Sequence, residues 1–231
     1  MKKTPSLTAQ MFNSIASYYD FLNHFFSLGI DYYWRRVMCR FLPQTPFTLL
    51  DCATGTGDQL LAFLKKSAFI TSAYGIDPAS KMLEKARIKL SQYHSKVSLV
   101  EASVEHLPFQ DEMFHTVSIS FGIRNVEDLS QSLLEIHRVL KPQGELLILE
   151  FSHPTHFLIR PLYFFYLNKL LPLLGKLISR HQRAYSYLAE TIKTFPQGKA
   201  LCEHLETAGF KEIHMTPLSL GIVTIYRGKK P

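Results

Sequence analysis

The sequence predicts an α/β protein in which a mostly parallel β-sheet carries helices on both faces. Three observations support this prediction. Residues 48–77 contain two short apolar segments, separated by a glycine-rich turn and a helical segment, as in a strand-turn-helix-strand unit. Strand-like and helix-like segments then alternate through residues 78–151. Two further apolar segments near the end of the chain are expected to form a closing antiparallel hairpin.

The first strand and the turn after it have the features of a ligand-binding turn. Thr48–Cys52 is short and apolar and has Asp51 near its end, as expected of a buried parallel strand. Gly55 and Gly57 allow the backbone to turn tightly and to approach a ligand where a Cβ atom would intrude.

A helix and a second strand follow the turn. Gln59–Lys66 has helical spacing, and its leucines can face the sheet. The strand Ala73–Asp77 ends in a carboxylate about 20 residues beyond the turn, where nucleotide-binding units place an acid on the ribose hydroxyls. These features predict a nucleoside site.

The turn matches neither of two common phosphate-binding loops. The dinucleotide fingerprint needs a third glycine at position 60, which is Leu60 here. A P-loop needs Gly-Lys-Ser/Thr after the turn, and the chain lacks it there. A nucleoside site without a pyrophosphate remains, with space for a small zwitterion. S-adenosylmethionine fits this description, and the alternative is a structural glycine turn in another α/β protein.

The remaining segments extend the same pattern. Leu129, Leu133, Ile136 and Leu140 recur at helical intervals. The further strands are expected at 97–100, 114–121, 145–151, 210–216 and 222–227, and the further helices at 80–90, 127–140 and 199–208. The chain has no repeat and no low-complexity segment, so residues 1–231 are expected to form a single domain.

Residues 1–43 are expected to form an aromatic-rich helical extension. Helical spacing runs through Met11–Phe26 and is broken near Gly29, and a second helix is expected over Asp31–Phe41. The aromatic side chains suit either the packing of the extension itself or a lid over the cofactor pocket.

Residues 151–189 differ in composition from everything before them. The segment is rich in aliphatic and aromatic residues and has no Asp or Glu, and its basic residues are Arg160, Lys169, Lys176, Arg180 and Arg183. Charges and prolines interrupt any apolar run long enough to span a membrane. This insertion could cover a hydrophobic substrate, lie on a membrane surface or pack between the subunits of a homodimer, and part of it could be an ordinary buried helix.

Charge and composition narrow the classes of partner. The 231 residues have a formal net charge of +7, which favours nucleic acid or an anionic membrane surface. The first ten residues are polar, so no secretion signal is expected. Three widely separated cysteines favour a reducing compartment, and the histidines show no metal-ligand spacing. A cytoplasmic protein without a metal is therefore expected.

Several motifs along the chain point to a known family. They are Met11–Ala16 with Tyr19–Asn23, Leu50–Asp58, Leu107–Phe109, Ser118–Asn125 and Arg138–Pro142. With them the sequence resembles the ubiquinone/menaquinone C-methyltransferase family over nearly its full length. The glycine-rich turn and the Leu-Lys-Pro stretch are shared by many S-adenosylmethionine enzymes, whereas the N-terminal block and Ser-Phe-Gly-Ile-Arg-Asn are more particular to quinone methylation.

The resemblance implies the class I S-adenosylmethionine-dependent methyltransferase fold, a Rossmann-like, mostly parallel seven-stranded sheet with a C-terminal antiparallel hairpin. It implies S-adenosyl-L-methionine as the cofactor. The residues expected at the cofactor are Asp51, Gly55, Thr56, Gly57, Asp77, Ser103, Val104 and Ser120. Many relatives have Asn-Ala where this chain has Ser103–Val104, and His-Arg where it has Asp31–Tyr32.

The implied reaction is transfer of a methyl group to a ring carbon of a prenylated quinol. Deprotonation of a phenolic hydroxyl would make the adjacent carbon nucleophilic, so the enzyme must align the reactants and stabilise the phenolate. Arg124 and Asn125 follow the fourth strand, where open α/β sheets present residues to ligands, and are the expected catalytic residues. Arg124 would face the quinol oxygen, and the alternative is that it binds loop carbonyls or pairs with Glu127.

The substrate and the activity have alternatives. The compact chain favours demethylmenaquinol, and so menaquinone biosynthesis, over the benzoquinol of the ubiquinone pathway. An RNA methyltransferase is a rival, but the basic residues concentrate in an aliphatic segment, so no nucleic-acid partner is expected. An assembly subunit that holds S-adenosylmethionine structurally is a second rival. The basic, apolar insertion predicts peripheral association with the inner face of the membrane.

Overall fold

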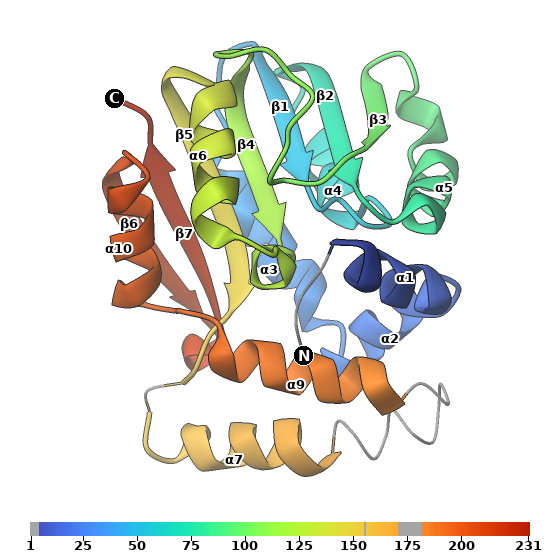
Figure 1. Ribbon diagram of the computed structural model, residues 1–231, viewed down its shortest axis with the longest axis vertical. Helices are drawn as coiled ribbons and strands as arrows, with labels where there is room; N and C mark the ends of the chain where they lie inside the picture. Colours follow the sequence, from blue (N-terminus) through green and yellow to red (C-terminus); the bar gives the residue numbers. More distant parts are fainter. Residues whose placement is uncertain (1–4, 155, 171–181) are drawn as a thin grey trace.

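The computed structural model describes residues 5–154, 156–170 and 182–231, which form a seven-stranded sheet flanked by helices (Figure 1). The strands are β1 (Phe47–Cys52), β2 (Ile70–Asp77), β3 (Val97–Glu101), β4 (Phe114–Ser120), β5 (Leu140–Phe151), β6 (Lys211–Leu218) and β7 (Val223–Lys229). The α-helices are α1 (Pro5–Ile15), α2 (Tyr19–Phe26), α3 (Ile30–Met38), α4 (Asp58–Lys66), α5 (Ser80–Lys89), α6 (Leu129–Val139), α7 (Ile159–Phe165), α9 (Gln182–Thr194) and α10 (Lys199–Thr207). Short 3₁₀ turns lie at Cys39–Phe41, Ser91–Tyr93, Ile123–Asn125 and Ser219–Gly221, and a π-helical turn at Tyr166–Leu170.

The sheet has the strand order β3-β2-β1-β4-β5-β7-β6. The neighbouring pairs among β3, β2, β1, β4 and β5 are all parallel. Strand β7 runs antiparallel to both β5 and β6. The predicted mostly parallel sheet with a C-terminal antiparallel hairpin is therefore confirmed.

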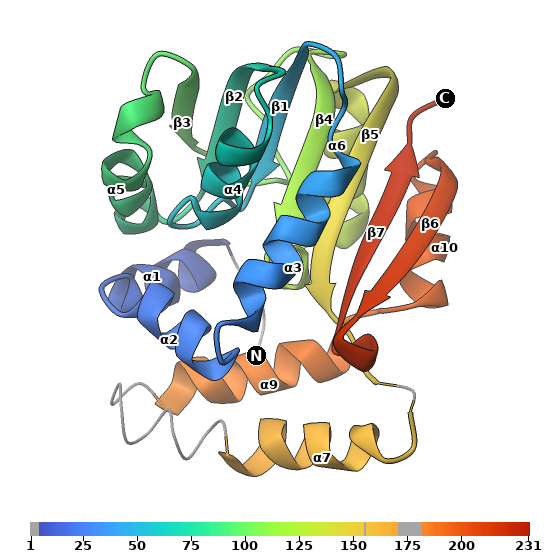
Figure 2. The same cartoon turned by 180° about the vertical axis from the view of Figure 1, so that it is seen from behind.

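The central strand β1 is buried on both faces, which explains its apolar sequence. Successive side chains of a strand point to opposite faces, so Leu49 joins a core cluster with Phe63 of α4, and Leu50 joins another with Ile136 of α6 and Leu205 of α10. Helices α3, α4 and α5 pack in the first cluster, on the side shown in Figure 2, and α6 and α10 pack in the second, on the side shown in Figure 1.

The direction of strand addition reverses between β1 and β4. The chain proceeds outward from β1 through β2 and β3, and then returns to the other side of β1 as β4. Open α/β sheets bind ligands at such a switch point, outside the carboxyl ends of the strands. The loops that follow the two strands meet there, because a Cβ atom on Gly122 would lie 2.6 Å from the Cβ atom of Ala53.

The predicted continuous helix over Met11–Phe26 is wrong, because the chain breaks it into α1 and α2. A turn at residues 16–18 separates them, with the Tyr18 N–H donating to the Ile15 carbonyl (3.0 Å). This turn contains neither proline nor glycine. Across the break, the ring of Tyr19 packs edge-to-face on Phe12, with 5.9 Å between the ring centroids.

Helix α7 and the first part of α9 belong to the predicted insertion, and both helices lie beyond the carboxyl ends of the central strands (Figure 1). Leu22 of α2, Tyr163 of α7 and Ile192 of α9 form one apolar cluster, so the insertion packs against the N-terminal helices. Lys176 and Arg180 lie outside the described residues. Within the described part of the chain, every helix is too short or too polar to cross a membrane.

Candidate active site

The two glycines in the turn after β1 have different structural roles. Both have positive φ angles, +57° at Gly55 and +84° at Gly57, which other residues rarely adopt. A Cβ atom on Gly57 would lie 3.0 Å from the Leu90 side chain, so this glycine lets α4 begin close to the end of α5. A Cβ atom on Gly55 would meet only the Tyr19 ring, at 4.0 Å. Gly55 lines a cavity at the switch point and presents its backbone there.

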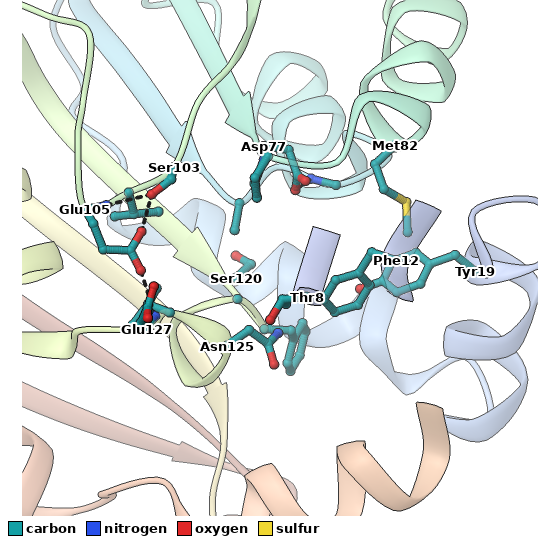
Figure 3. Close-up of a pocket in the computed structure, with 17 residues that line it drawn as sticks. Thr8, Phe12, Tyr19, Asp77, Met82, Ser103, Glu105, Ser120, Asn125 and Glu127 are labelled. Atoms are coloured by element: carbon teal, nitrogen blue, oxygen red, sulfur yellow. Dashed lines mark hydrogen bonds between the residues drawn. The ribbon is translucent and has the colours of Figure 1, made fainter. Parts of the chain in front are cut away.

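Asp77 lies at the end of β2 and lines the same cavity (Figure 3). Its Oδ2 atom accepts a hydrogen bond from the Gly55 N–H (2.9 Å), and its Oδ1 atom accepts one from the Ala79 N–H (2.8 Å). Burial raises the pKa of Asp77 to about 6. An ionised carboxylate has about four acceptor positions, so the two backbone donors leave room for hydroxyl donors from the cavity.

Asp51, a predicted cofactor residue, does not line this cavity. The residue is 1% exposed, and its two oxygens accept hydrogen bonds from the hydroxyls of Thr54 (2.7 Å) and Ser118 (2.6 Å). Burial raises the pKa of Asp51 to about 6. Asp51 therefore ties the glycine turn to β4 through Thr54 and Ser118.

Thr56 and Gly57 also lie off the cavity. Thr56 is 2% exposed, and its hydroxyl donates to Oδ1 of Asp20 at 2.5 Å. The Lys89 ammonium donates to Oδ2 of Asp20 (2.8 Å), to the Thr56 hydroxyl (3.1 Å) and to Asp58. The side chain expected at the cofactor thus joins a polar network that holds α2 against the glycine turn.

The loop after β3 forms another wall of the cavity (Figure 3). Ser103 and Val104, which were predicted to lie at the cofactor, line this cavity, and so does Glu105. The Ser103 hydroxyl donates to Oε2 of Glu105, and the Glu127 N–H donates to Oε1 (2.7 Å). Glu105 is absent from the residues predicted from the sequence. Its sequence position could have indicated a place at the cavity, because Glu105 is an acid in a loop that follows the carboxyl end of a strand.

The loop after β4 completes the wall with Ser120, Phe121, Gly122 and Asn125. The Ser120 hydroxyl donates to the Met38 sulfur at 3.4 Å. The buried Oδ1 atom of Asn125 has no hydrogen-bond partner among the described residues. An unpaired buried acceptor costs about 1–3 kcal/mol. This atom is therefore available to accept a hydrogen bond from a ligand or a water.

The N-terminal helices close the cavity from the side opposite the loops. Thr8 and Phe12 of α1 and Tyr19 of α2 line it together with Met82 of α5 (Figure 3). Burial raises the pKa of the Tyr19 phenol, so this side chain stays protonated at neutral pH. The cavity has a volume of about 80 Å³.

A larger, mainly apolar cavity of about 350 Å³ adjoins the first and shares Tyr19 and Phe121 with it. Its apolar lining includes Phe26, Ile30, Trp34, Phe151, Leu162, Leu167, Leu188, Ile192 and Ile222. Its polar and charged lining includes Asn23, Ser27, Asp31, Arg35, Arg124, Tyr163, Tyr166 and Ser219. The hydroxyl of Tyr163 is buried and has no hydrogen-bond partner in the described part of the chain.

Arg124 lines the larger cavity, whereas Asn125 lines the smaller one. The residue is 6% exposed, and its Nη1 atom donates to both carboxylate oxygens of Glu150 (2.8 and 3.1 Å) and to the Phe121 carbonyl. The alternative expected for this side chain, a bond to a loop carbonyl, is present at Phe121, whereas its acidic partner is Glu150 on β5 and not Glu127. The guanidinium also lies over the Phe151 ring, 5.4 Å from its centroid.

The fold is that of the class I S-adenosylmethionine-dependent methyltransferases. A methyltransferase of this class from Thermotoga maritima has a similar structure, with a TM-score of 0.67 and 19% identity over 96% of this chain and 99% of its own. Another, from Aquifex aeolicus, has a TM-score of 0.60 and 16% identity over 86% of this chain and 89% of its own. At these identities the likeness shows the fold alone.

Sequence comparison identifies the family. The chain belongs to the ubiE/COQ5 methyltransferase family, whose profile matches residues 1–230. A ubiquinone/menaquinone biosynthesis C-methyltransferase from Geotalea daltonii is 42% identical over 224 residues, which are 96% of this chain and 95% of the relative. A demethylmenaquinone methyltransferase from Bacteroides fragilis is 39% identical over 223 residues, 96% of this chain and 91% of the relative. The resemblance predicted from the motifs is confirmed.

The residues of the smaller cavity fit S-adenosylmethionine, the cofactor of this class. Asp77 has acceptor positions left for ribose hydroxyls, and the unpaired Oδ1 atom of Asn125 can accept from an amino or ammonium group. Val104 and Met82 add apolar surface on which an adenine can lie. These donor, acceptor and apolar positions match the parts of a nucleoside with a charged tail.

We predict that the affinity for S-adenosylmethionine falls as the pH drops through 6. The carboxylate form of Asp77 accepts hydroxyl donors, and a pKa of about 6 means that this form predominates above pH 6 and is lost below it. Calorimetric titration should show affinity about tenfold weaker at pH 5 than at pH 7, because one proton then competes with binding.

Two variants assign this dependence to a residue. Asp77→Asn should bind at least tenfold more weakly at pH 7 and lose the pH dependence, because each charge-assisted hydrogen bond contributes about 1.5–3 kcal/mol. Asp51→Asn removes the other carboxyl of similar pKa and should keep the dependence. A pH dependence that survives in Asp77→Asn would assign it to another group.

Proposed function

We propose that this protein transfers a methyl group from S-adenosylmethionine to a ring carbon of a prenylated quinol, with demethylmenaquinol as the preferred substrate. The observation that carries the proposal is the contact of two unlike cavities, one suited to a nucleoside and one apolar and large enough for a quinol ring and the start of its tail. The relatives, which are named as methyltransferases of ubiquinone/menaquinone biosynthesis and as demethylmenaquinone methyltransferases, support it.

The bound cofactor would supply an electrophilic methyl group on a sulfonium. Asp77 would hold the ribose, the loop of Ser103, Val104 and Glu105 would flank the adenine, and Asn125 would accept a hydrogen bond from the amino acid part. Gly55 would let the backbone approach closely. Thr56 and Asp51 would act indirectly, by fixing the turn.

Residues 1–43 would act as a lid over the cofactor. The smaller cavity is well below the roughly 300–1,000 Å³ of typical ligand pockets. Thr8 and Phe12 of α1 take part in its lining, so a displacement of α1 would enlarge it. Tyr19, which lines both cavities, would separate the cofactor from solvent and form the boundary between the two reactants.

Arg124 would favour the ionised form of the quinol. A permanent cation in the wall of an apolar cavity lowers the pKa of a nearby phenol, and so raises the nucleophilicity of the ring carbon. Glu150 offsets part of this charge and holds the guanidinium in place. The Tyr163 hydroxyl can donate a hydrogen bond to the second quinol oxygen.

The proposal is tested with the purified protein, S-adenosylmethionine and reduced short-chain quinols under anaerobic conditions. Mass spectrometry should detect a C-methylated product from demethylmenaquinol. A benzoquinol of the ubiquinone pathway, assayed in parallel, should be methylated more slowly. The absence of product from both quinols would overturn the proposed function, and faster methylation of the benzoquinol would assign the chain to the other pathway.

We predict that Arg124→Ala lowers turnover by about two to three orders of magnitude, the scale for removing one oxyanion donor. Arg124→Lys keeps the charge and should be intermediate. Cofactor affinity, measured by calorimetry, should stay near that of the wild type, because Arg124 does not line the smaller cavity.

A control is needed because Arg124→Ala also leaves Glu150 buried without its partner, which costs about 3–5 kcal/mol of stability. Glu150→Gln removes the negative charge and leaves the guanidinium in place. Per folded molecule, this variant should retain or exceed wild-type turnover. Equal losses in Glu150→Gln and Arg124→Ala would make the ion pair purely structural.

The exposed apolar residues of α2, α7 and their adjoining loops would bind a membrane surface. Three residues that line the larger cavity are also exposed, Leu28 (84%), Ile30 (42%) and Leu162 (65%), so a lipid substrate could enter between them. Exposed neighbours extend this apolar rim: Phe21, Phe25, Phe157, Leu158 and Phe165. Arg160 and Lys169 are exposed on the same segment and would contact anionic headgroups at the inner face of the membrane.

We predict that the protein sediments with vesicles that contain phosphatidylglycerol, and that high salt weakens this binding partly. Each basic residue at an anionic surface contributes about 1 kcal/mol, and salt screens this term but not apolar insertion. The variant Phe157→Ser/Leu162→Ser/Phe165→Ser should bind more weakly. Ile88→Ser, which removes an equally exposed apolar side chain from α5, is the matched control. Equal binding to neutral and anionic vesicles would contradict the electrostatic contribution, and full binding of the triple variant would contradict the role of the rim.

A further inference from the structure

Asp31 is the single carboxylate among the described residues that line the larger cavity. The residue is only 4% exposed. A charge in an apolar site needs partners, and Oδ1 of Asp31 accepts from the Ser27 hydroxyl (2.7 Å) while Oδ2 lies 2.8 Å from Nδ1 of His24 and 3.6 Å from Nε of Arg35. Acceptor positions remain on both oxygens for a group inside the cavity.

His24 connects this carboxylate to the outside of the cavity. Its side chain does not line the cavity and is 21% exposed. One ring nitrogen contacts Asp31, and Nε2 lies 3.8 Å from Oδ2 of Asp58, which is paired with Lys89. The imidazole also stacks on Tyr32, with 4.3 Å between the ring centroids. An imidazole held in this way can take a proton on one nitrogen and release one from the other.

The other titratable groups of the cavity are poor proton acceptors. Burial raises the pKa of Tyr19 and Tyr163, and raises that of Tyr166 to about 12, so these phenols stay protonated at neutral pH. The guanidinium groups of Arg35 and Arg124 have donors only. Asp31 is therefore the lining residue that combines burial, free acceptor positions and a connection to solvent.

We propose that Asp31 is the base that removes the hydroxyl proton of the quinol, and that His24 relays this proton to water. This inference rests on the proposed function. The O–H bond breaks and its proton passes to the Asp31 carboxylate, while the ring carbon forms the bond to the methyl group and the S–C electron pair stays on sulfur. The carbon then loses its C–H proton to water, which restores the aromatic ring, and the oxygen takes a proton from water. One proton is released per turnover.

Steady-state kinetics with a short-chain quinol test the role of Asp31. Asp31→Asn should lower kcat by about 100-fold or more, since general-base catalysis contributes about 10²–10⁴-fold. The deficit should shrink as the pH rises toward the ordinary phenol pKa of about 10, because an ionised quinol needs no base. A structural role predicts a deficit that does not change with pH. His24→Gln should lower kcat by a smaller factor, and Asp111→Asn, an exposed carboxylate paired with Arg138, should leave it unchanged.

A binding measurement tests the same contact without turnover. A hydroxynaphthalene whose ionised form absorbs at a longer wavelength is bound to the wild type and to Asp31→Asn. Its ionisation is then followed by absorbance as the pH is changed. The negative charge of Asp31 disfavours a phenolate beside it, so the apparent pKa of the bound reporter should be lower in Asp31→Asn than in the wild type. The variant would thus bind a more acidic phenol and yet turn over more slowly.

Three results would overturn the inference: an unchanged reporter pKa, wild-type kcat in Asp31→Asn, or a deficit independent of pH. Wild-type kcat in His24→Gln would overturn the relay. If the wild-type protein methylates no quinol, the proposed function fails, whereas the reporter titration still decides whether Asp31 faces a phenol in this cavity.

Discussion

The contact between the loops after β1 and β4 positions both cavities. Gly122 must lack a side chain because Ala53 lies against it. Ala53 and Phe121 adopt positive φ angles, +48° and +57°, which cost about 1–2 kcal/mol for residues other than glycine. Strain of this kind persists only where the surrounding structure imposes it, and it is found mainly at functional sites. Here Ala53 and Phe121 line the smaller cavity, and Phe121 also lines the larger one.

Polar contacts join helix α2 to the glycine turn and to α3, in addition to the apolar packing of the N-terminal helices. Asp20 bonds to Thr56 and Lys89, while His24 contacts Asp31 and lies near Asp58. These links run from the glycine turn to the wall of the larger cavity. They place Tyr19 at the boundary between the two sites, so the position of α2 affects both at once.

Buried charges of both signs lie at the larger cavity. Arg124 pairs with Glu150, and Asp31 lies among Ser27, His24 and Arg35. Because the surroundings are apolar, each charge acts more strongly on a bound quinol than it would in water. The same surroundings make each charge costly without its partner. A cation and a carboxylate in one cavity can therefore divide the work of stabilising a phenolate and removing its proton.

Local sequence patterns were enough to predict the sheet. The periodicity of the strands and helices, the glycines of the turn and the spacing to Asp77 depend on residues close together in the chain, whose conformational preferences are largely local. Of the residues expected at the cofactor, five line the smaller cavity: Gly55, Asp77, Ser103, Val104 and Ser120. The motifs also identified the family, because they are stretches of contiguous residues.

The tertiary structure decided the roles of individual side chains. Arg124 pairs with Glu150 and not with Glu127. Asp51 and Thr56 bond to other side chains, Ser118 and Asp20 respectively, and Asp31 lines the larger cavity. The break between α1 and α2 likewise has no proline or glycine to mark it. The bonds of Arg124 to Glu150, of Thr56 to Asp20 and of Asp51 to Ser118 join residues far apart in the sequence. A carboxylate or hydroxyl has the same sequence signal whether it faces a ligand or another side chain. Packing selects between these alternatives, because a buried polar group must be paired with whichever partner the fold brings within reach.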